Sequence, residues 1–392
     1  MTAIPNNVTP QVNVNGEFKN LDKNINALLN ATPTNNTDIL VEDMIGTPMI
    51  DFFSEAEKDI DEFDDFAWQT GEGYKAPSYP IVSEKLEGFS QGLYLFAGAS
   101  NHGKSAMMMN LMYDLCQNPE NNLFGIYFSL DDSKNEIIPR IVAMDQRIPI
   151  SVVSKPARYK NFIDAVDANG TTDNEQNIAK VLQFEEYLEK RRDGLSNLRN
   201  NANKFKIEDS TKCTNLDDMK DYIIKAINYI KSIDENMNLI VAIDSINDVC
   251  LGSNHKASSN NERLDIVSRE IKHWTVEFNI PILASTHLRK LNGNRRPTLD
   301  DMKDSIVLRY EASVIWLVYN EVSENKNAAK IYYANEEGDT VEKKPIIELD
   351  WAKNKKSSYK GRSFNYFSPE YSKAVECDEN ISLRYNALVY EA

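Results

Sequence analysis

Residues 96–110, FAGASNHGKSAMMMN, contain the pattern from which the predicted fold of this chain follows. Gly98, Gly103, Lys104 and Ser105 satisfy GxxxxGK[ST]. In this pattern the glycines let backbone N–H groups surround phosphate oxygens, the lysine reaches the outer phosphates and the hydroxyl coordinates Mg²⁺. A glycine turn with an incidental Lys-Ser pair is the alternative interpretation. The predicted phosphate-binding loop consists of Gly98, Ala99, Ser100, Asn101, His102, Gly103, Lys104, Ser105 and Ala106.

The residues around this loop have the strand and helix patterns that a phosphate-binding loop requires. GLYLFAG at 92–98 is an apolar run, and AMMMNLMYDLC after the loop is typical of a helix buried in a core, where methionines fill irregular space. Further apolar runs lie at 123–130, 239–245, 280–286 and 313–319, with longer helical patterns between them. Such alternation predicts an α/β fold with a mostly parallel sheet flanked by helices.

The chain outside this alternating region has a different pattern. Residues 330–335, 345–354 and 362–368 form successive strand patterns without helices between them, which predicts an antiparallel edge at the C-terminal side of the sheet. Residues 175–204 are charged and helix-prone, and we expect a helix on the surface there. The predicted organisation is an acidic, partly disordered extension at 1–80, a main domain at 81–375 and a tail at 376–392.

Charge is distributed unevenly over the 392 residues. Residues 1–80 carry 14 acids and 4 bases, whereas the remainder carries 46 acids and 40 bases, so most of the net charge of −16 lies in the extension. Residues 41–65 alternate apolar and acidic residues, a composition typical of a solvated extension or of a segment that docks a partner. No apolar run reaches the roughly 18 residues of a membrane span. The start of the sequence lacks the pattern of a signal peptide, and we expect a cytoplasmic protein without a membrane partner.

Two strand ends supply carboxylates that would complete a site for ATP and Mg²⁺. Asp244 follows the apolar run at 239–243, where a second carboxylate beside the metal is expected, and Ser105 is the other predicted metal ligand. Asp131 follows the run at 123–130 and is a candidate to activate water. A turn or helix cap is the alternative for Asp131.

The order of motifs resembles the RecA-like motor domain of DnaB-type hexameric replicative helicases. The resemblance covers about residues 81–370. Its motifs are GASNHGKS (98–105), FSLDD (128–132), IEDS (207–210), IDSIND (243–248), SREIK (268–272), PILASTHL (281–288), RRPTLDDMKDSI (295–306) and AKNKKSSYKG (352–361).

This resemblance implies a RecA-like P-loop fold and an ATP-dependent DNA helicase that forms a homo-hexameric ring around single-stranded DNA. ATP would lie between neighbouring subunits. Asp131 takes the place of the catalytic base and His287 that of the residue that senses the γ-phosphate. Lys353 and Lys355 take the place of the basic finger that one subunit supplies to the next. The family uses Glu for the base and Arg for the finger, and Lys lacks the planar fork of Arg, so slow turnover is one expected consequence.

The positions of the family's DNA-binding loops correspond to 252–263 and 288–297. The nucleic-acid candidates there are Lys256, Arg263, Arg295 and Arg296. The extension is shorter than the family's N-terminal domain, which suggests a bacteriophage version that meets a primase, loader or polymerase through its acidic segment. Two alternatives stay open at this point. One is a DNA-dependent ATPase that acts as a loader or recombination factor without unwinding, and the other is a nucleotide-gated scaffold with little turnover.

Overall fold

The computed structural model describes residues 52–69, 73–168, 175–289, 295–302, 306–321, 332–334, 340–343 and 345–390. The chain divides into two compact units, Met1–Gly71 and Glu72–Ala392. In the first unit, α3 (Phe52–Gln69) is a helix whose large apolar side chains Phe52, Phe53, Ile60 and Phe63 are exposed. Residues 1–51 lie outside the described residues, so the expected disorder there stays a prediction.

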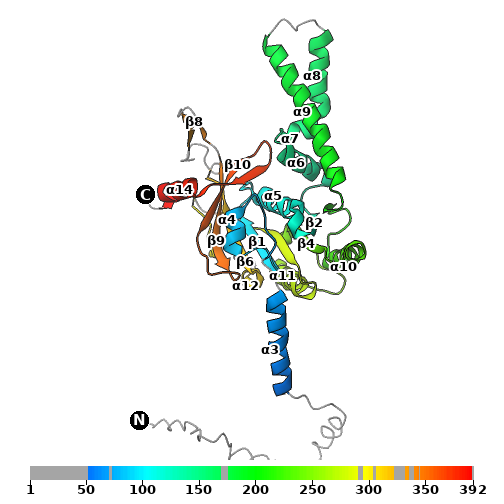
Figure 1. Ribbon diagram of the computed structural model, residues 1–392, viewed down its shortest axis with the longest axis vertical. Coiled ribbons are helices and arrows are strands. Elements are labelled where there is room, and N and C mark those ends of the chain that lie inside the picture. The colour runs from blue at the N-terminus through cyan, green and yellow to red at the C-terminus, as the bar shows by residue number, and fades with distance from the viewer. Residues whose placement is uncertain are drawn as a thin grey trace, which may run out of the picture. The chain divides into compact units, whose positions relative to one another are not determined.

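The second unit alternates strands and helices in chain order (Figure 1). Its helices are α4 (Pro80–Leu86), α5 (Lys104–Gln117), α6 (Lys134–Gln146), α7 (Ile150–Ser154), α8 (Pro156–Ala168), α9 (Glu175–Asn200), α10 (Leu216–Ile233), α11 (Asn260–Glu277), α12 (Ile306–Glu311) and α14 (Glu379–Tyr390), with short 3₁₀ helices η1 (Pro119–Asn121), η3 (Ile246–Asp248) and η4 (Leu299–Asp301). Its strands are β1 (Gly92–Gly98), β2 (Leu123–Ser129), β3 (Phe205–Asp209), β4 (Asn238–Asp244), β5 (Pro281–His287), β6 (Val314–Tyr319), β7 (Tyr332–Ala334), β8 (Thr340–Lys343), β9 (Ile346–Asn354), β10 (Arg362–Ser368) and β11 (Lys373–Glu376).

Among the described residues, nine of these strands form one sheet in the order β11-β10-β9-β6-β1-β5-β4-β2-β3. The strands from β6 to β3 in this order are parallel, whereas β9, β10 and β11 are antiparallel to their neighbours. The predicted α/β fold with an antiparallel C-terminal edge is therefore confirmed. β7 and β8 form a separate two-stranded sheet.

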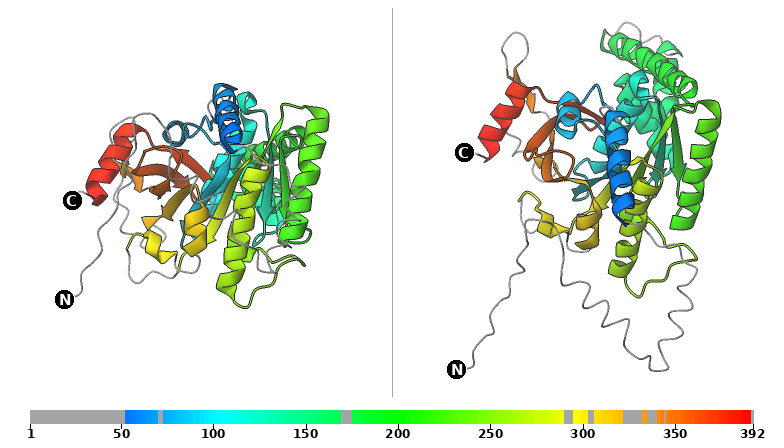
Figure 2. Two further views of the ribbon diagram at one scale, coloured as in Figure 1. Left: turned by 90° about the horizontal axis from the view of Figure 1, so that it is seen from below. Right: turned by 60° about the horizontal axis from the view of Figure 1, so that its bottom comes forward.

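The side chains of β1 show how the sheet is covered on both faces. Tyr94 and Phe96 belong to the apolar cluster that contains α5 and α6, while Leu93 and Leu95 belong to the cluster that contains α10 and α11. This alternation follows from the two-residue period of a strand. Figure 2 shows helices on both sides of the sheet. The methionines at 107–109 are buried in the first cluster, as predicted.

Local sequence explains where several helices begin. The side chain of Asn215 accepts a hydrogen bond from the Asp218 N–H, so it caps α10 as predicted.

The predicted surface helix at 175–204 is α9, which is mostly exposed and packs on α6 and α8 (Figure 1). Among the described residues, no helix is both long enough and apolar enough to cross a membrane.

The residues at both predicted domain boundaries pack against the main domain. Tyr74 forms a β-bridge with Phe89, and Tyr385 of α14 is buried against Phe364. The boundaries at 80 and 375 stay predictions, but the segment predicted as a tail contains a helix that packs on the sheet.

Candidate nucleotide-binding site

The loop between β1 and α5 lies close against two neighbouring strands, β6 and β9, and a glycine stands at each of these close contacts. A Cβ on Gly98 would lie 2.7 Å from the Val318 carbonyl oxygen, and a Cβ on Gly103 would lie 2.5 Å from Ile347 Cδ1. Gly103 also has a φ of 91°, which side-chain-bearing residues rarely adopt, and it directly precedes the first turn of α5. Backbone N–H groups at a helix N-terminus bind phosphate oxygens, so this loop has the geometry that the sequence predicts.

Lys104 lies folded back over this loop. Its Nζ donates a 2.8 Å hydrogen bond to the Ala99 carbonyl oxygen, and the residue is only 6% exposed. Burial lowers the pKa of Lys104, while the negative charge of Asp244 acts in the opposite direction. A buried ammonium group next to a glycine loop is suited to an anionic ligand such as the outer phosphates of a nucleotide.

His102 has a structural contact that the sequence did not indicate. Its Nδ1 accepts a 3.0 Å hydrogen bond from the Asn320 N–H, and its ring lies 5.2 Å from the ring of Tyr319. Only 1% of His102 is exposed. The end of β6 therefore helps to fix the phosphate-binding loop in place.

Asp244 lies at the end of β4 between two hydroxyl groups. Tyr127 Oη donates to its Oδ2 at 2.7 Å, and Ser285 Oγ donates to its Oδ1. Burial and the neighbouring Asp244 raise the pKa of Tyr127, so its hydroxyl keeps the proton that it donates. Asp244 ends β4 and its charge acts on Lys104, so its carboxylate lies near the phosphate-binding loop. The sequence did not single out Tyr127 or Ser285, although each is a hydroxyl in an otherwise apolar strand.

Ser105 lies in the first turn of α5 and is half-buried. Within the described ranges, no three His, Cys, Asp or Glu side chains gather as a metal site. Ser105 and Asp244 stay the predicted Mg²⁺ ligands, because a donor set of one hydroxyl and one carboxylate suits a metal that keeps most of its water shell.

Asp131 is exposed just beyond the end of β2. Its neighbour Asp132 pairs with Arg140 at 2.6 Å, whereas the carboxylate of Asp131 has no hydrogen-bond partner among the described residues. Asp131 is two residues past Ser129, which pairs with Asp244 in the β2–β4 register. It thus lies at the same end of the strands as the other site residues. Its role as a base stays a prediction.

His287 ends β5 and pairs directly with Gly98 in the parallel register of β1 and β5. Its N–H and the hydroxyl of Thr286 both donate to Asn247 Oδ1, each at 2.9 Å. Asn247 lies in η3, three residues after Asp244. One amide side chain therefore joins the His287 strand to the Asp244 strand, a link that the sequence did not reveal.

Lys353 and Lys355 lie toward the other end of the strands, away from the phosphate-binding loop. Lys353 Nζ donates to the carbonyl oxygens of Arg309 and Tyr310 at 2.5 and 2.9 Å, and Lys355 Nζ donates to the Tyr310 carbonyl oxygen at 3.3 Å. Burial, together with the charge of Lys355, lowers the pKa of Lys353 to about 8. The Lys355 N–H bonds to the Ser313 carbonyl, five residues before the Val318 that pairs with Gly98, a separation of roughly 16 Å along the strand.

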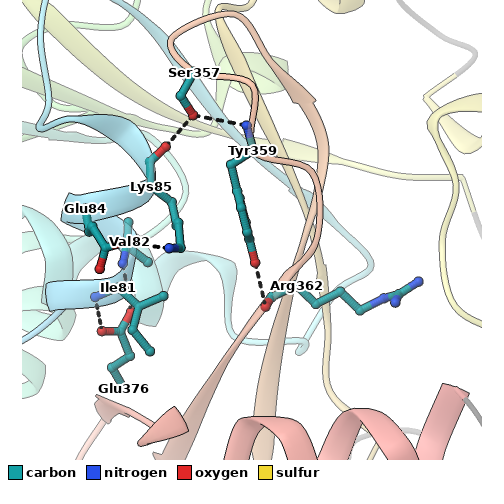
Figure 3. A network of polar contacts seen from close by, with 8 residues as sticks. All are labelled: Ile81, Val82, Glu84, Lys85, Ser357, Tyr359, Arg362 and Glu376. Atoms are coloured by element: carbon teal, nitrogen blue, oxygen red, sulfur yellow. Dashed lines mark hydrogen bonds and ion pairs between the residues drawn. The ribbon is translucent and has the colours of Figure 1, made fainter.

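The turn after Lys355 is fixed to α4 (Figure 3). Ser357 Oγ donates to the Lys85 carbonyl oxygen at 2.5 Å, and Tyr359 Oη donates to the Arg362 carbonyl oxygen at 3.4 Å. Glu376 accepts hydrogen bonds from two N–H groups in the first turn of α4, at 2.7 and 3.1 Å. The end of β9 is therefore held in a defined position.

The four candidate residues for nucleic-acid contact have different surroundings. Lys256 is exposed in the connection before α11. Arg263 donates to the carbonyl oxygens of Val249 and Asn247, so it supports the backbone after β4. Arg295 forms two hydrogen bonds with Asp301, and its side chain stays 47% exposed.

Arg296, the fourth candidate, pairs with an acid of the sheet. It forms a bidentate pair with the buried Glu348, with distances of 2.7 and 2.6 Å. Its guanidinium group also lies 4.8 Å from the ring centres of Tyr319 and Tyr390. These contacts occupy the guanidinium group of Arg296, whose side chain is 25% exposed, and leave Lys256 and Arg295 as the exposed candidates.

A phosphate-binding loop between β1 and α5, with a carboxylate at the end of β4 in a mostly parallel sheet, defines a P-loop domain of the RecA-like class. The family model of the DnaB-like helicase C-terminal domain matches residues 78–373, and the chain belongs to this family. This confirms the resemblance noted from the motifs.

Two curated relatives support this assignment. The replicative DNA helicase DnaB of Mycoplasma pneumoniae is 24% identical over 326 residues, which are 80% of this chain and 61% of that protein. A probable replicative DNA helicase of Trieres chinensis is 24% identical over 276 residues, which are 69% of this chain and 50% of that protein. The chain thus spans between half and about three fifths of the length of these relatives.

Two solved structures have the same fold. One is an ATPase domain that superposes with a TM-score of 0.58 at 18% identity, covering 84% of this chain and all of that domain. The other is a DnaB-like replicative helicase, described with its interactions with primase, which superposes with a TM-score of 0.56 at 17% identity, covering 91% of this chain and 75% of that one. At these identities the likeness establishes the fold alone.

Proposed function

We propose that this chain is the motor subunit of an ATP-dependent replicative DNA helicase that works as a homo-hexameric ring. The observation that carries the proposal is the position of Lys353 and Lys355. They lie at the opposite end of the strands from Lys104, too far away to reach the phosphate-binding loop of their own chain. A nucleotide bound by Lys104 would meet such lysines only in a neighbouring subunit.

ATP would bind with its phosphates in the loop of residues 98–106. Gly98 and Gly103 let the loop lie close against β6 and β9, and Lys104 supplies the buried positive charge. Ser105 and Asp244 would hold Mg²⁺, which neutralises charge on the transferred phosphoryl group when it is bound.

The residues at the same sheet edge have distinct roles in this proposal. Asp131 orients and deprotonates the attacking water, and its exposed carboxylate has no hydrogen-bond partner among the described residues. His287 donates a hydrogen bond to the terminal phosphate. A shift of His287 on phosphate binding would then move Asn247, and with it the backbone after β4. Lys355, with Lys353 beside it, stabilises the negative charge that develops in the site of the neighbouring subunit.

Single-stranded DNA would pass through the ring near the connections that precede α11 and η4. Lys256 and Arg295 are the exposed cations proposed to contact its phosphates, in keeping with sequence-independent tracking of the backbone. The mild net acidity of the main domain does not oppose this, because the field in a channel is set by local charges.

We further propose that the protein acts in the cytoplasm and is phage-encoded, in which case that is the cytoplasm of the host. The acidic first unit would dock a primase, a loader or a polymerase. Its exposed aromatic side chains and surplus of acids on α3 support a docking role.

A forked-duplex assay tests the proposal. Unwinding that needs ATP and disappears in Lys104→Ala supports the helicase. Hydrolysis stimulated by single-stranded DNA without unwinding would instead indicate a loader or recombination ATPase. Nucleotide binding without turnover would indicate a nucleotide-gated scaffold. The Asp at position 131 and the Lys at position 355, where the family has Glu and Arg, make these two outcomes the relevant alternatives.

A further inference from the structure

Glu348 of β9 is a buried carboxylate that receives four hydrogen bonds. Only 1% of the residue is exposed. Arg296 donates two of the bonds, and Tyr385 Oη and Tyr390 Oη donate the others, at 2.7 and 2.5 Å. A buried charge is costly unless donors surround it, so each of these bonds helps to fix Glu348 in one position.

Both tyrosines belong to α14. Burial and the charge of Glu348 raise the pKa of Tyr385 and of Tyr390, so both hydroxyls remain protonated and act as donors. Tyr390 also covers the Arg296 guanidinium with its ring at 4.8 Å. α14 therefore supplies two hydrogen bonds and one face of the cluster. Its residues lie beyond position 373, where the match to the family model ends.

The Glu348 cluster contacts the phosphate-binding loop by two routes. In the first, Ile347, the strand neighbour of Glu348, occupies the space beside Gly103, with its Cδ1 2.5 Å from where a Cβ would be. In the second, Arg296 stacks on Tyr319, whose ring lies 5.2 Å from the ring of His102. Gly103 and His102 are both residues of the loop.

We propose that Tyr385 and Tyr390 are positioning residues for the nucleotide site. They hold Glu348 and, through it, Arg296, and these two residues keep Ile347 against Gly103 and Tyr319 against His102. Helix α14 thereby fixes the shape of the loop through residues of β6 and β9. The inference rests on the proposed function, because it takes this loop to bind ATP.

A role in nucleotide binding differs measurably from a role in stability alone. Loss of the two hydroxyls would leave Glu348 with Arg296 as its partner and allow β9 to shift beside the loop. Affinity for nucleotide would then fall, while the groups that carry out hydrolysis would be unchanged. If α14 only adds packing, the melting temperature would fall and affinity would not.

The test compares the full-length chain with Tyr385→Phe, Tyr390→Phe and the double variant. Each change removes one hydroxyl and keeps the ring. The dissociation constant of a fluorescent non-hydrolysable ATP analogue with Mg²⁺ is measured beside the melting temperature and the kcat and KM of ATP hydrolysis. Tyr229→Phe on α10 is the matched control, because Tyr229 is 66% exposed and lies on a helix outside the cluster.

We expect the double variant to weaken analogue binding and raise KM by roughly three- to tenfold, which corresponds to the net contribution of about one ordinary hydrogen bond, with kcat nearly unchanged. Tyr229→Phe should match the wild type. Unaltered analogue binding in a folded double variant, with only a lower melting temperature, would overturn the inference and leave the proposed function standing. A wild-type protein that binds no analogue would refute the proposed function itself. The single variants give the same comparison if the double variant does not fold.

Discussion

The placement of Lys355 predicts that two inactive variants restore each other's activity. Lys355 lies roughly 16 Å along the sheet from Gly98 of its own chain, beyond the reach of a lysine side chain. Lys104→Ala should disable the site on its own chain, and Lys355→Ala should disable the site on the neighbour. Each variant alone should then hydrolyse ATP at a small fraction of the wild-type rate.

The expected magnitude follows from counting interfaces in a ring of head-to-tail contacts. When the two variants are mixed in equal amounts before assembly, a site is intact only where a Lys355→Ala chain supplies the loop and a Lys104→Ala chain supplies the finger. Random assembly gives this arrangement at about a quarter of the sites, so ATPase activity should recover to about a quarter of the wild-type value.

The assay measures phosphate release over a series of mixing ratios, with a maximum expected at equal amounts. Lys104→Ala alone, taken through the same mixing and assembly steps, is the control for activity that arises without the second variant. Absence of recovery at every ratio would contradict a shared site. Full activity of Lys355→Ala alone would show that Lys355 is not the finger, and Lys353 would then be the residue to change.

Three further predictions concern the site and its support. Gly103→Ala should cost about 1–3 kcal/mol in stability and abolish nucleotide binding, because the φ of 91° strains a side-chain-bearing residue and the new Cβ meets Ile347; melting and analogue binding check this. Tyr127→Phe should cost about 1.5–3 kcal/mol and lower Mg²⁺-dependent ATPase activity by removing a donor to Asp244, measured by urea unfolding and metal titration. Burial, opposed by two backbone N–H donors, raises the pKa of Glu376 from 4.5 to about 7, so the folded state binds this proton more tightly than the unfolded state. Its contribution to stability is present below about pH 4.5 and decreases by up to about 3 kcal/mol as the pH rises to 7, so the melting temperature should fall over this range in the wild type and less in Glu376→Gln.

The sequence predicted the central strands because their burial makes them visible. β1, β2, β4, β5 and β6 are covered on both faces, so they appear as apolar runs without polar alternation. β3 has the sequence FKIED and lies at one edge of the sheet, where alternating polar residues are tolerated. An apolar run does not mark such a strand, although the motif IEDS within it was noted.

Short-range patterns predicted the phosphate-binding loop, whereas long-range contacts determine what holds it. The GxxxxGK[ST] spacing is contained in eight consecutive residues and needs no partner to be recognised. The contact of His102 with Asn320 spans 218 residues, and that of Tyr127 with Asp244 spans 117. Arg296 illustrates the same limit, because a basic residue in a loop indicates nucleic acid until its pairing with Glu348 is seen.

β9 joins two places that a ring would assign to different ATP molecules. Near its start, Ile347 lies against Gly103 of its own phosphate-binding loop, and just past its end is Lys355, the residue proposed to act on the next subunit. This single strand, whose first half contains the cluster around Glu348, connects these two points. In a closed hexamer, six such strands would connect the six ATP sites in turn. Nucleotide binding at one site would then shift the charge that its β9 presents to the next site. Sequential ATP hydrolysis around the ring would then need no coupling element other than the strand itself.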